Sequence, residues 1–398
     1  MTQYLSAQEA CDRLGVKEAT LYAYVSRGLI RSEVESQSSR KRRYLAEDVD
    51  KLVDRKEQRR DPAKVVEDAL HWGVPLLDSA ITMIADNRLY FRGQDAADLA
   101  QTQSLEAVAA LIWLDDVSLA PNLFAQPFIS INFAALASMN LPPMPALQMA
   151  LTLASVQDFA AYDLHPSGVA RTGARILKLM TAVLSSQSRP SEHNLADILA
   201  AGWSTDAAFL LNAAMVLCAD HELNASSFAA RVTASVEANP YAVVQAGLAA
   251  IQGFKHGGQS TRVTAFVREV GQIKRVQQAI GERLRRGDDL PGFGHNLYPE
   301  GDPRAKALMN MMAERLPASS SLTLSQTLAE TVVKMTGKLP TIDFALATLE
   351  RALSLPDGSA LCLFALGRTV GWIGHAIEQY GSPQIIRPRA RYTGRPPQ

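Results

Sequence analysis

Residues 291–305 read PGFGHNLYPEGDPRA, a stretch that sets His295 on a glycine-hinged loop and places Arg304 nine residues later. Glycines on both sides of a histidine let the backbone approach a ligand closely. A nearby guanidinium can donate two parallel hydrogen bonds to one carboxylate. A proton donor beside such a clamp indicates chemistry on a small polycarboxylic acid. Taken alone, however, the stretch is more often a surface turn that happens to contain a histidine.

Several other motifs accompany this stretch in a fixed order. They are DSAITMIADNRLYFRGQD (residues 78–95), DHELNASSFAAR (220–231), GFKHGG (253–258), LPTIDFAL (339–346), FALGRTVGWIGHAIEQ (364–379) and IIRPRARYTG (385–394). In this order the set resembles the citrate synthase family. The resemblance covers the chain from the seventies to the C-terminus.

The resemblance implies an all-α fold, the citrate synthase fold, with the active site in a cleft between a large and a smaller helical domain. We expect the large domain at residues 61–258 and 358–398, and the small domain at 259–357. The sequence pattern of this region also predicts helices. Alanine- and leucine-rich segments with helical periodicity fill most of it, for example residues 105–114, 147–162, 169–185 and 224–238. The exception is residues 76–91, which predict a short hairpin around Asp86-Asn87.

Composition indicates a soluble globular protein of more than one domain, because 398 residues can bury a large core and the net charge is zero. The three cysteines lie far apart, which fits a reducing cytosol. No secretory leader is visible, and the most apolar run, residues 207–219, is too short to span a bilayer and predicts a buried helix. We therefore expect a cytoplasmic protein without a membrane segment, and no metal, since no histidine and carboxylate show ligand spacing.

The first sixty residues follow a different pattern. Ser6 and Glu9 form a capping box that begins a short helix ending near Gly15. A second helix is expected at residues 17–27, stopping at Gly28. Its inward side chains are Leu21 and Val25, packing with Leu29 and Ile30. Its polar face holds Lys17, Thr20, Tyr24 and Arg27.

A basic run follows and predicts a wing rich in phosphate contacts, made by Arg40, Arg42 and Arg43, with a third helix beginning near Ala46. This module resembles the winged helix-turn-helix DNA-binding domain of the MerR and excisionase regulators, matched by LSAQEACDRLGVKEATLYAYVSRGLI and RRYLAEDVDKL. The resemblance implies DNA contacts through residues 1–60. The alternative is a small helical docking domain whose basic run is merely solvated.

For the main body, the resemblance implies carbon–carbon bond formation. An acyl-CoA thioester loses an α-proton, its enol attacks the ketone of oxaloacetate, and the citryl-type thioester is hydrolysed. The thioester is a very weak carbon acid and needs a carboxylate base, for which the matching residue is Asp343. It stands in the apolar run LPTIDF, where an isolated carboxylate is costly unless it is paired or functional. The alternative is a helix N-cap after Pro340.

The remaining roles follow from the same resemblance. His256 matches the donor to the enolate oxygen and His295 the general acid for the alkoxide, although a His-Gly-Gly sequence alone is more often a turn. The carboxylates of oxaloacetate would be held by His221, Arg304 and Arg368, with Asn224 orienting groups and Arg387 donated across a homodimer interface. His375 has no such context and is expected to be a structural hydrogen-bonder.

Two stretches depart from the family pattern. Residues 256–260 read HGGQS where most members read HGGAN, and residues 295–301 read HNLYPEG where a basic residue usually follows HRVY. The resemblance places the second stretch near the CoA phosphates. Pro299 and Glu300 are therefore expected to weaken or reshape CoA binding.

Three functions remain open at this point. The leading hypothesis is an acyltransferase that condenses an acyl-CoA, with acetyl-CoA as the first candidate, with oxaloacetate; the CoA thioester is a co-substrate and no cofactor is covalently bound. The second is a transcription regulator that uses a synthase-like body to sense a metabolite. The third is a 2-methylcitrate synthase using propionyl-CoA, which differs only in pocket shape, since a methylene is worth only ~1–3 kcal/mol.

Overall fold

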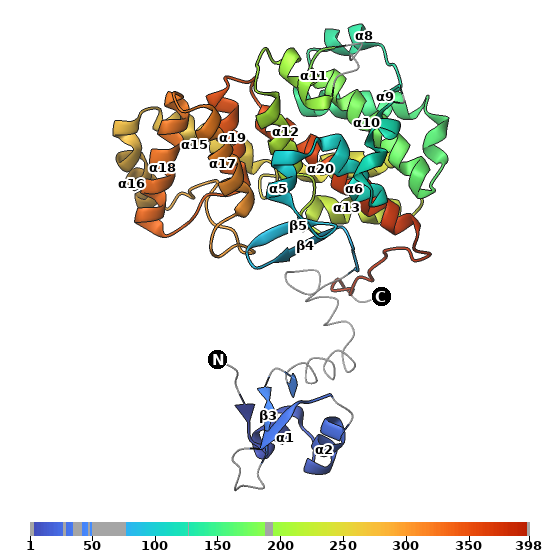
Figure 1. Ribbon diagram of the computed structural model, residues 1–398, viewed down its shortest axis with the longest axis vertical. Coiled ribbons are helices and arrows are strands. Elements are labelled where there is room, and N and C mark those ends of the chain that lie inside the picture. Colours follow the sequence, from blue (N-terminus) through green and yellow to red (C-terminus); the bar gives the residue numbers. More distant parts are fainter. Residues whose placement is uncertain are drawn as a thin grey trace. The chain divides into compact units, whose positions relative to one another are not determined.

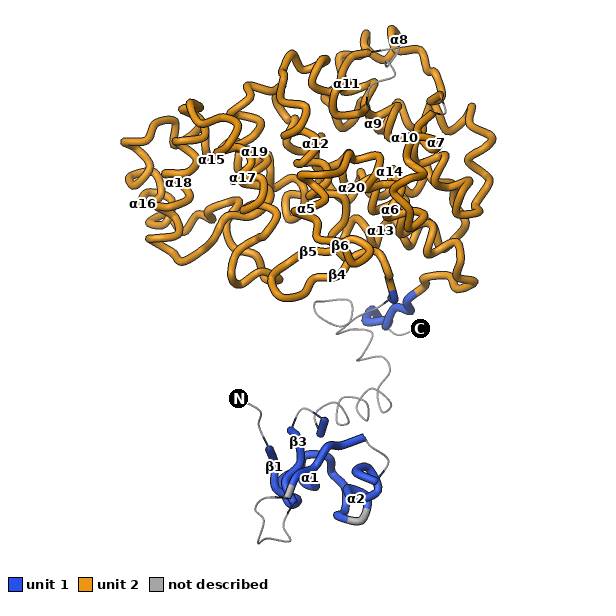
Figure 2. Tube along the Cα trace, in the orientation of Figure 1, with its two compact units in different colours: residues 1–78, 388–398 blue, residues 79–387 orange. Residues whose placement is uncertain are grey.

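The computed structural model describes residues 4–26, 29–34, 42–46, 48–49, 77–125, 127–187 and 194–395. The chain divides into two compact units, residues 1–78 with 388–398 and residues 79–387 (Figure 2). Each unit has an apolar core of its own.

The described residues of the first unit include the short helices α1 (Ala7–Leu14) and α2 (Glu18–Ser26) and a small antiparallel sheet, and Ala46, Asp48 and Val49 are also helical. The strands of the sheet are β1 (Tyr4–Leu5), β2 (Ser32–Val34) and β3 (Arg42–Leu45), in the order β1-β3-β2. The predicted capping box is confirmed, because Ser6 N donates to Glu9 Oε2 at 2.8 Å and Glu9 N donates to Ser6 Oγ at 3.3 Å. Gly15 ends α1 in the left-handed region, at φ 61°.

The predicted faces of α2 are confirmed only in part. Lys17 and Thr20 are exposed as expected, whereas Tyr24 is half-buried against the core of the unit. The prediction that Leu29 packs inward is wrong, since its side chain is 39% exposed while that of Ile30 is 2% exposed. Adjacent side chains point to opposite sides where the chain is not helical, so only one of these two can enter the core.

The basic side chains of this unit are described in part. Arg42 and Arg43 are exposed on β3. Arg42 Nη1 donates to Ser32 Oγ at 3.3 Å, and the Arg43 guanidinium lies 5.0 Å from the centre of the Tyr4 ring. The predicted positions Arg27 and Arg40, and most of the predicted third helix, fall outside the described residues.

The second unit is mainly helical, which confirms the all-α fold class, and its only strands among the described residues form a sheet of order β4-β5-β6. The elements are β4 (Thr82–Ala85), β5 (Arg88–Phe91), β6 (Gln94–Asp95), α5 (Ala96–Thr102), α6 (Leu105–Leu114), η1 (Val117–Leu119), α7 (Ala120–Phe124), α8 (Phe133–Ser138), α9 (Pro143–Ser155), η2 (Phe159–Tyr162), α10 (Pro166–Leu184), α11 (Leu195–Gly202), α12 (Ala208–Leu217), α13 (Ala225–Ala234), α14 (Pro240–Ile251), α15 (Gln259–Val270), η3 (Ile273–Arg275), α16 (Val276–Arg286), α17 (Pro303–Arg315), α18 (Ser320–Thr336), α19 (Ile342–Ala352) and α20 (Ser359–Tyr380).

The predicted hairpin is confirmed as β4 and β5. Its two turn residues, Asp86 and Asn87, have φ values of 49° and 56°. A two-residue turn with both φ values positive matches the twist of the flanking strands, and Asp and Asn tolerate that conformation better than most residues.

Helix α20 is the centre of the second unit. It packs against α6, α10, α12, α13, α14 and α19. Figure 1 shows α12 and α20 in the middle of the unit, with α15, α16 and α18 at one end and α8, α9 and α10 at the other. A side chain on the inner face of α20 is therefore held by neighbours from several parts of the sequence.

Glycines allow this close packing. A Cβ at Gly367 would lie 2.2 Å from Met215 O, and one at Gly371 would lie 2.5 Å from Ala219 O. Any other residue at either position would push α20 away from the end of α12. The sequence FALGRTVGWIG therefore brings α20 against the chain that leaves α12.

A second, smaller cluster of buried apolar side chains is drawn from residues 263–347. Most of its members lie on α15, α16, α18 and α19. All of its residues fall within 259–357, the range of the predicted small domain, but other side chains of that range, such as Leu308 and Leu346, belong to the larger cluster. The boundaries of that domain stay a prediction, because the unit of residues 79–387 is compact as a whole.

Two apolar helices are buried inside the protein. The run at residues 207–219 forms α12, and its buried position confirms the prediction. In the part of the chain that the structure describes, α20 has the length and apolar composition of a membrane span, but 89% of that window is buried inside the unit. Burial of this extent is typical of a core helix.

Glycine substitutions on two helices test this packing. We expect Gly367→Ala to lower the free energy of unfolding by roughly 1–3 kcal/mol, because the added methyl meets the Met215 carbonyl. Gly281→Ala on α16 is the matched control, since its Cβ would meet nothing within 4 Å, and it should raise stability by about 0.5–1 kcal/mol. Urea unfolding followed by circular dichroism measures both changes. Equal effects of the two substitutions would contradict the packing.

Candidate active site

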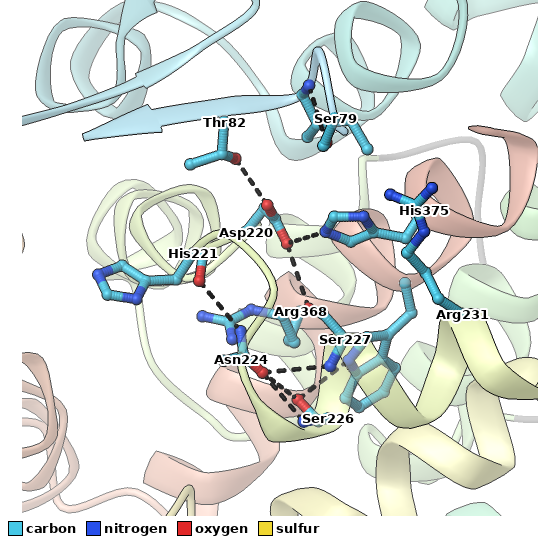
Figure 3. Close-up of polar contacts among 12 residues, drawn as sticks. Ser79, Thr82, Asp220, His221, Asn224, Ser226, Ser227, Arg231, Arg368 and His375 are labelled. Atoms are coloured by element: carbon cyan, nitrogen blue, oxygen red, sulfur yellow. Dashed lines mark hydrogen bonds and ion pairs between the residues drawn. The ribbon is translucent and has the colours of Figure 1, made fainter. Parts of the chain in front are cut away.

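The short segment between α12 and α13 presents His221. Asn224 caps α13, its Oδ1 accepting from the backbone N–H groups of Ser226 and Ser227 at 3.1 and 3.2 Å, and its Nδ2 donates to His221 O at 3.3 Å (Figure 3). Asn224 therefore holds this segment against the start of α13, while its predicted role toward the substrate stays a prediction. The His221 ring is buried, and its Nε2 lies 2.8 Å from the hydroxyl of Tyr298.

The loop PGFGHNLYPEGDPRA (residues 291–305) holds His295 next to the His221 ring. Gly292 and Gly294 have φ values of 86° and 83°, so both need the freedom of glycine. Gly294 N donates to Leu339 O at 2.8 Å, and Thr341 N donates to Gly292 O at 2.9 Å. These bonds join the loop to the segment that begins α19. The ring centres of His295 and His221 lie 5.4 Å apart.

The protonation of His295 follows from its surroundings. Burial lowers its pKa, and the charge of Arg304 lowers it further, which favours a neutral ring. Its Nδ1 accepts from Leu297 N at 3.2 Å, so the single hydrogen of the neutral ring sits on Nε2. His295 thus offers one N–H donor.

Two buried arginines flank these histidines. Arg304 is held by Asp302, with Nε donating to Oδ1 at 2.9 Å and Nη2 to Oδ2 at 2.8 Å. Arg368 donates from Nε to Cys218 O at 2.9 Å, and its buried Nη2 has no partner among the described residues. An unpaired donor on a buried guanidinium is costly unless an anion completes it.

His256 lies at the start of the turn that leads into α15. Its Nε2 is 2.8 Å from Ser226 Oγ, which also receives a hydrogen bond from Trp372 Nε1 at 3.2 Å. Burial lowers the pKa of His256 to about 4, with Arg368 and Arg304 adding to the effect. The pKa of His221 is likewise held well below its usual value, by burial first and then by Arg304 and Arg368. All three histidines are thus neutral near pH 7.

Asp343 stands in the first turn of α19. The N-cap of that helix is Thr341, so the N-cap alternative for Asp343 is wrong. Its Oδ1 accepts from Ser260 Oγ at 2.9 Å. Burial raises the pKa of Asp343 to about 6, while the Ser260 hydrogen bond and Arg304 oppose the rise. A carboxylate with a raised pKa is a stronger base than an exposed one.

The structure therefore brings most of the predicted site residues together, and Arg387 is the exception. The set that converges comprises His221, Asn224, His256, His295, Arg304, Asp343 and Arg368. Arg387 is exposed in the extended segment after α20, and no contact joins it to this set within the described chain. Among the described residues, no three His, Cys, Asp or Glu side chains are placed to hold a metal ion.

Four side chains of the site were not singled out from the sequence: Ser226, Ser260, Tyr298 and Asp302. Tyr298 and Asp302 lie inside the stretch PGFGHNLYPEGDPRA, and the DPR triplet with a proline at the first helical position is a recognisable helix start. Ser226 and Ser260 follow the histidine motifs closely in sequence. Serine has no pattern of its own, so only the folded structure shows which partner each one takes.

Comparisons with known proteins agree with this arrangement. The family described as citrate synthase, C-terminal domain, matches residues 69–389, and a helix-turn-helix domain family matches residues 4–57. Citrate synthase 2 of Bacillus subtilis is 30% identical over 351 residues, covering 81% of this chain and 94% of that protein. 2-Methylcitrate synthase 1 of Corynebacterium glutamicum is 25% identical over 346 residues, covering 78% and 91%.

Solved structures share the fold. The crystal structure of citrate synthase from Thermotoga maritima superposes with a TM-score of 0.70 at 26% identity, covering 81% of this chain and 94% of that one. The family model matches most of the chain, and a 30% identical relative is covered over 94% of its length. The chain belongs to the citrate synthase family, acyltransferases that form a carbon–carbon bond.

Proposed function

We propose that the protein condenses an acyl-CoA thioester with oxaloacetate and releases CoA, and that acetyl-CoA is the acyl donor. The observation that carries the proposal is the buried, unpaired Nη2 of Arg368, beside Arg304 and among three neutral histidines. Two buried cations with one free donor suit a small dicarboxylate. The citrate synthase of Thermoplasma acidophilum, which shares the fold at 23% identity and a TM-score of 0.70, is described in complex with carboxymethyl coenzyme A and oxaloacetate.

Asp343 takes the first step in this proposal. Its carboxylate removes a proton from the carbon next to the thioester carbonyl, and the electrons move onto the carbonyl oxygen. Ser260 keeps the carboxylate oriented through its bond to Oδ1. The raised pKa matches the carboxylate better to its task, since a base works best when its pKa is near the operating pH.

His256 stabilises the enol oxygen that forms. The Ser226 hydroxyl donates to Asn224 Oδ1 at 2.8 Å and lies 2.8 Å from His256 Nε2. In this proposal the hydroxyl hydrogen turns from Asn224 to His256 Nε2, so the neutral ring has its own hydrogen on Nδ1. That N–H then points away from Ser226 and is free to donate to the enol oxygen.

His295 and the arginines act on oxaloacetate. The enolate carbon attacks the ketone carbon, and His295 passes its Nε2 hydrogen to the oxygen that becomes a hydroxyl. The ring then regains a proton from solvent, and Asp343 releases the proton that it took from the thioester, so the protons balance. His221, Arg304 and Arg368 hold the carboxylates. Water then hydrolyses the thioester, which releases the acid and the CoA thiol.

An acyl-CoA panel with Asp343 variants tests this function. We expect thiol release with oxaloacetate and acetyl-CoA, and a loss of turnover by roughly 10²–10⁴ in Asp343→Ala. Because a base must be ionised, kcat/KM of the wild type should fall as the pH drops below about 6 and reach a plateau above it. Stopped spectrophotometric thiol assays across pH measure both.

The panel also separates the acyl donors. Propionyl-CoA as the better substrate would replace citrate with 2-methylcitrate as the product. If no thiol is released with acetyl-, propionyl- or longer acyl-CoA, the proposed enzyme activity is contradicted. An unchanged turnover in Asp343→Ala would remove Asp343 as the base and leave the reaction in place.

We further propose that the enzyme is a cytoplasmic homodimer in which Arg387 completes the site of the partner. Arg387 is exposed and away from the residues of its own site. The second unit also exposes apolar side chains after α9, with Val156, Phe159 and Tyr162 at 74%, 82% and 68%. Such a cluster on a folded protein typically marks an interaction surface.

Mixed dimers test this arrangement. Arg387→Ala and Asp343→Ala should each be inactive alone. When the two chains are co-expressed, each mixed dimer has one site with both residues intact, so roughly a quarter of the wild-type activity should return. If the mixture stays inactive although mass measurement finds mixed dimers, Arg387 does not act across the interface.

A second function, DNA binding by the first unit, is favoured by the helix-turn-helix match at residues 4–57 and by exposed Lys17, Thr20, Arg42 and Arg43. We expect a gel shift with DNA from around its own gene that weakens as salt rises, because phosphate contacts release counterions. Arg42→Ala with Arg43→Ala should abolish the shift. Arg285→Ala, an exposed arginine of α16, is the matched control and should leave it unchanged. A shift that survives the double substitution would contradict the proposed face.

A further inference from the structure

The segment that leads to His221 is attached to α20 at three successive points. Cys218 O accepts from Arg368 Nε at 2.9 Å, and Ala219 O accepts from Gly371 N at 2.9 Å. The Asp220 carboxylate then lies 3.3 Å from His375 Nε2. Figure 3 shows Asp220 between His221, which is next in the chain, and His375 on α20.

Asp220 is the point where three elements meet. Its side chain has no exposed surface. Thr82 Oγ1 on β4 donates to Oδ2 at 2.6 Å, and Ser227 Oγ on α13 donates to Oδ1 at 3.5 Å (Figure 3). Burial opposes ionisation, yet His375, the charge of Arg368 and the Thr82 hydrogen bond hold the pKa of Asp220 below its usual value. Asp220 is therefore a buried carboxylate with a built set of partners.

His375 extends the set away from the site. Its ring has no exposed surface, and its Nδ1 lies 3.9 Å from Glu378 Oε2. The Glu378 carboxylate in turn accepts two hydrogen bonds, from Ala80 N to Oε1 at 2.8 Å and from Arg231 Nη1 to Oε2 at 3.2 Å. The imidazole is thus enclosed by two carboxylates, one at each nitrogen, and neither group touches the reacting atoms.

We propose that Asp220 is a positioning residue, which through His375, Thr82 and Ser227 fixes the segment of residues 218–220 so that His221 and Arg368 are correctly placed for the dicarboxylate substrate. The inference rests on the proposed function, because it assigns these two residues to oxaloacetate. Arg368 is included because its Nε is bound to the same segment, so a shift of Cys218 O re-aims the free Nη2. Binding groups lose effectiveness when they move by a fraction of an ångström.

Asp220→Asn tests this inference. The amide keeps the size of the side chain and an oxygen for Thr82, but removes the charge opposite His375. We expect KM for oxaloacetate to rise roughly 10-fold or more, with a smaller change in KM for acyl-CoA, because only the dicarboxylate contacts His221 and Arg368. Glu106→Gln is the matched control: a buried carboxylate that accepts from Leu195 N instead of from site residues. It should leave both KM values unchanged.

A cycle of variants separates positioning from general stability. His375→Asn should raise KM for oxaloacetate similarly, and the double variant should show less than the product of the two single effects, because both remove one interaction. Thr82→Val, which leaves the contact between Asp220 and His375 intact, provides a milder change if Asp220→Asn fails to fold. It should raise KM for oxaloacetate by a smaller factor.

The outcomes are distinct. A folded Asp220→Asn with the wild-type KM for oxaloacetate and only a lower melting temperature would overturn the positioning role and leave the proposed function untouched. If the wild type releases no thiol but binds oxaloacetate in calorimetry, weaker binding by Asp220→Asn supports the positioning role while the proposed reaction fails. A wild type that does not bind oxaloacetate overturns both.

Discussion

The buried guanidinium of Arg368 is the constraint on which the site depends. It sits on α20, the helix around which the second unit packs, and is 1% exposed. Cys218 O pairs one of its nitrogens; burial lowers the pKa of the guanidinium, and the charge of Asp220 opposes that fall. Within the part of the chain that the structure describes, Nη2 has no hydrogen-bond partner. A buried cation with an unused donor is expensive to maintain, and a site that keeps one is organised for an anion that arrives from outside.

The same positive charge determines the state of the histidines. Arg304 and Arg368 act with burial to keep His221, His256 and His295 neutral. A neutral imidazole has one N–H, and its hydrogen-bond partner decides which nitrogen holds it. The arginines meanwhile favour every negative charge in the reaction, those of the carboxylates and those that develop on oxygen. Burial and the arginines thus keep the three histidines neutral, and the hydrogen-bond partner of each ring decides which nitrogen donates.

Sequence alone predicted those parts of the structure that depend on local pattern. The Asp86-Asn87 turn, the Ser6–Glu9 cap and the glycines around His295 each need a particular residue at one position, so each is visible in a single sequence. Partner choice is different. That Tyr298 bonds His221, or that Asp220 faces His375, depends on how α13 and α20 pack, and no local pattern encodes it. His375 was expected to be a structural hydrogen-bonder, but its ring nitrogens only lie near the carboxylates of Asp220 and Glu378, at 3.3 and 3.9 Å, and neither has a hydrogen-bond partner among the described residues.

The loop with His295 has two halves under different physical constraints. Tyr298, Asp302 and Arg304 are buried, and a change at any of them leaves a partner unpaired inside the protein. Pro299 and Glu300 are exposed, where a single charge is screened and is typically worth under about 1 kcal/mol. The departure from the family pattern thus falls on the half that tolerates change. In the proposed function, affinity for the phosphates of CoA would depend on the exposed half of the loop, whereas recognition of the keto acid would depend on the buried half.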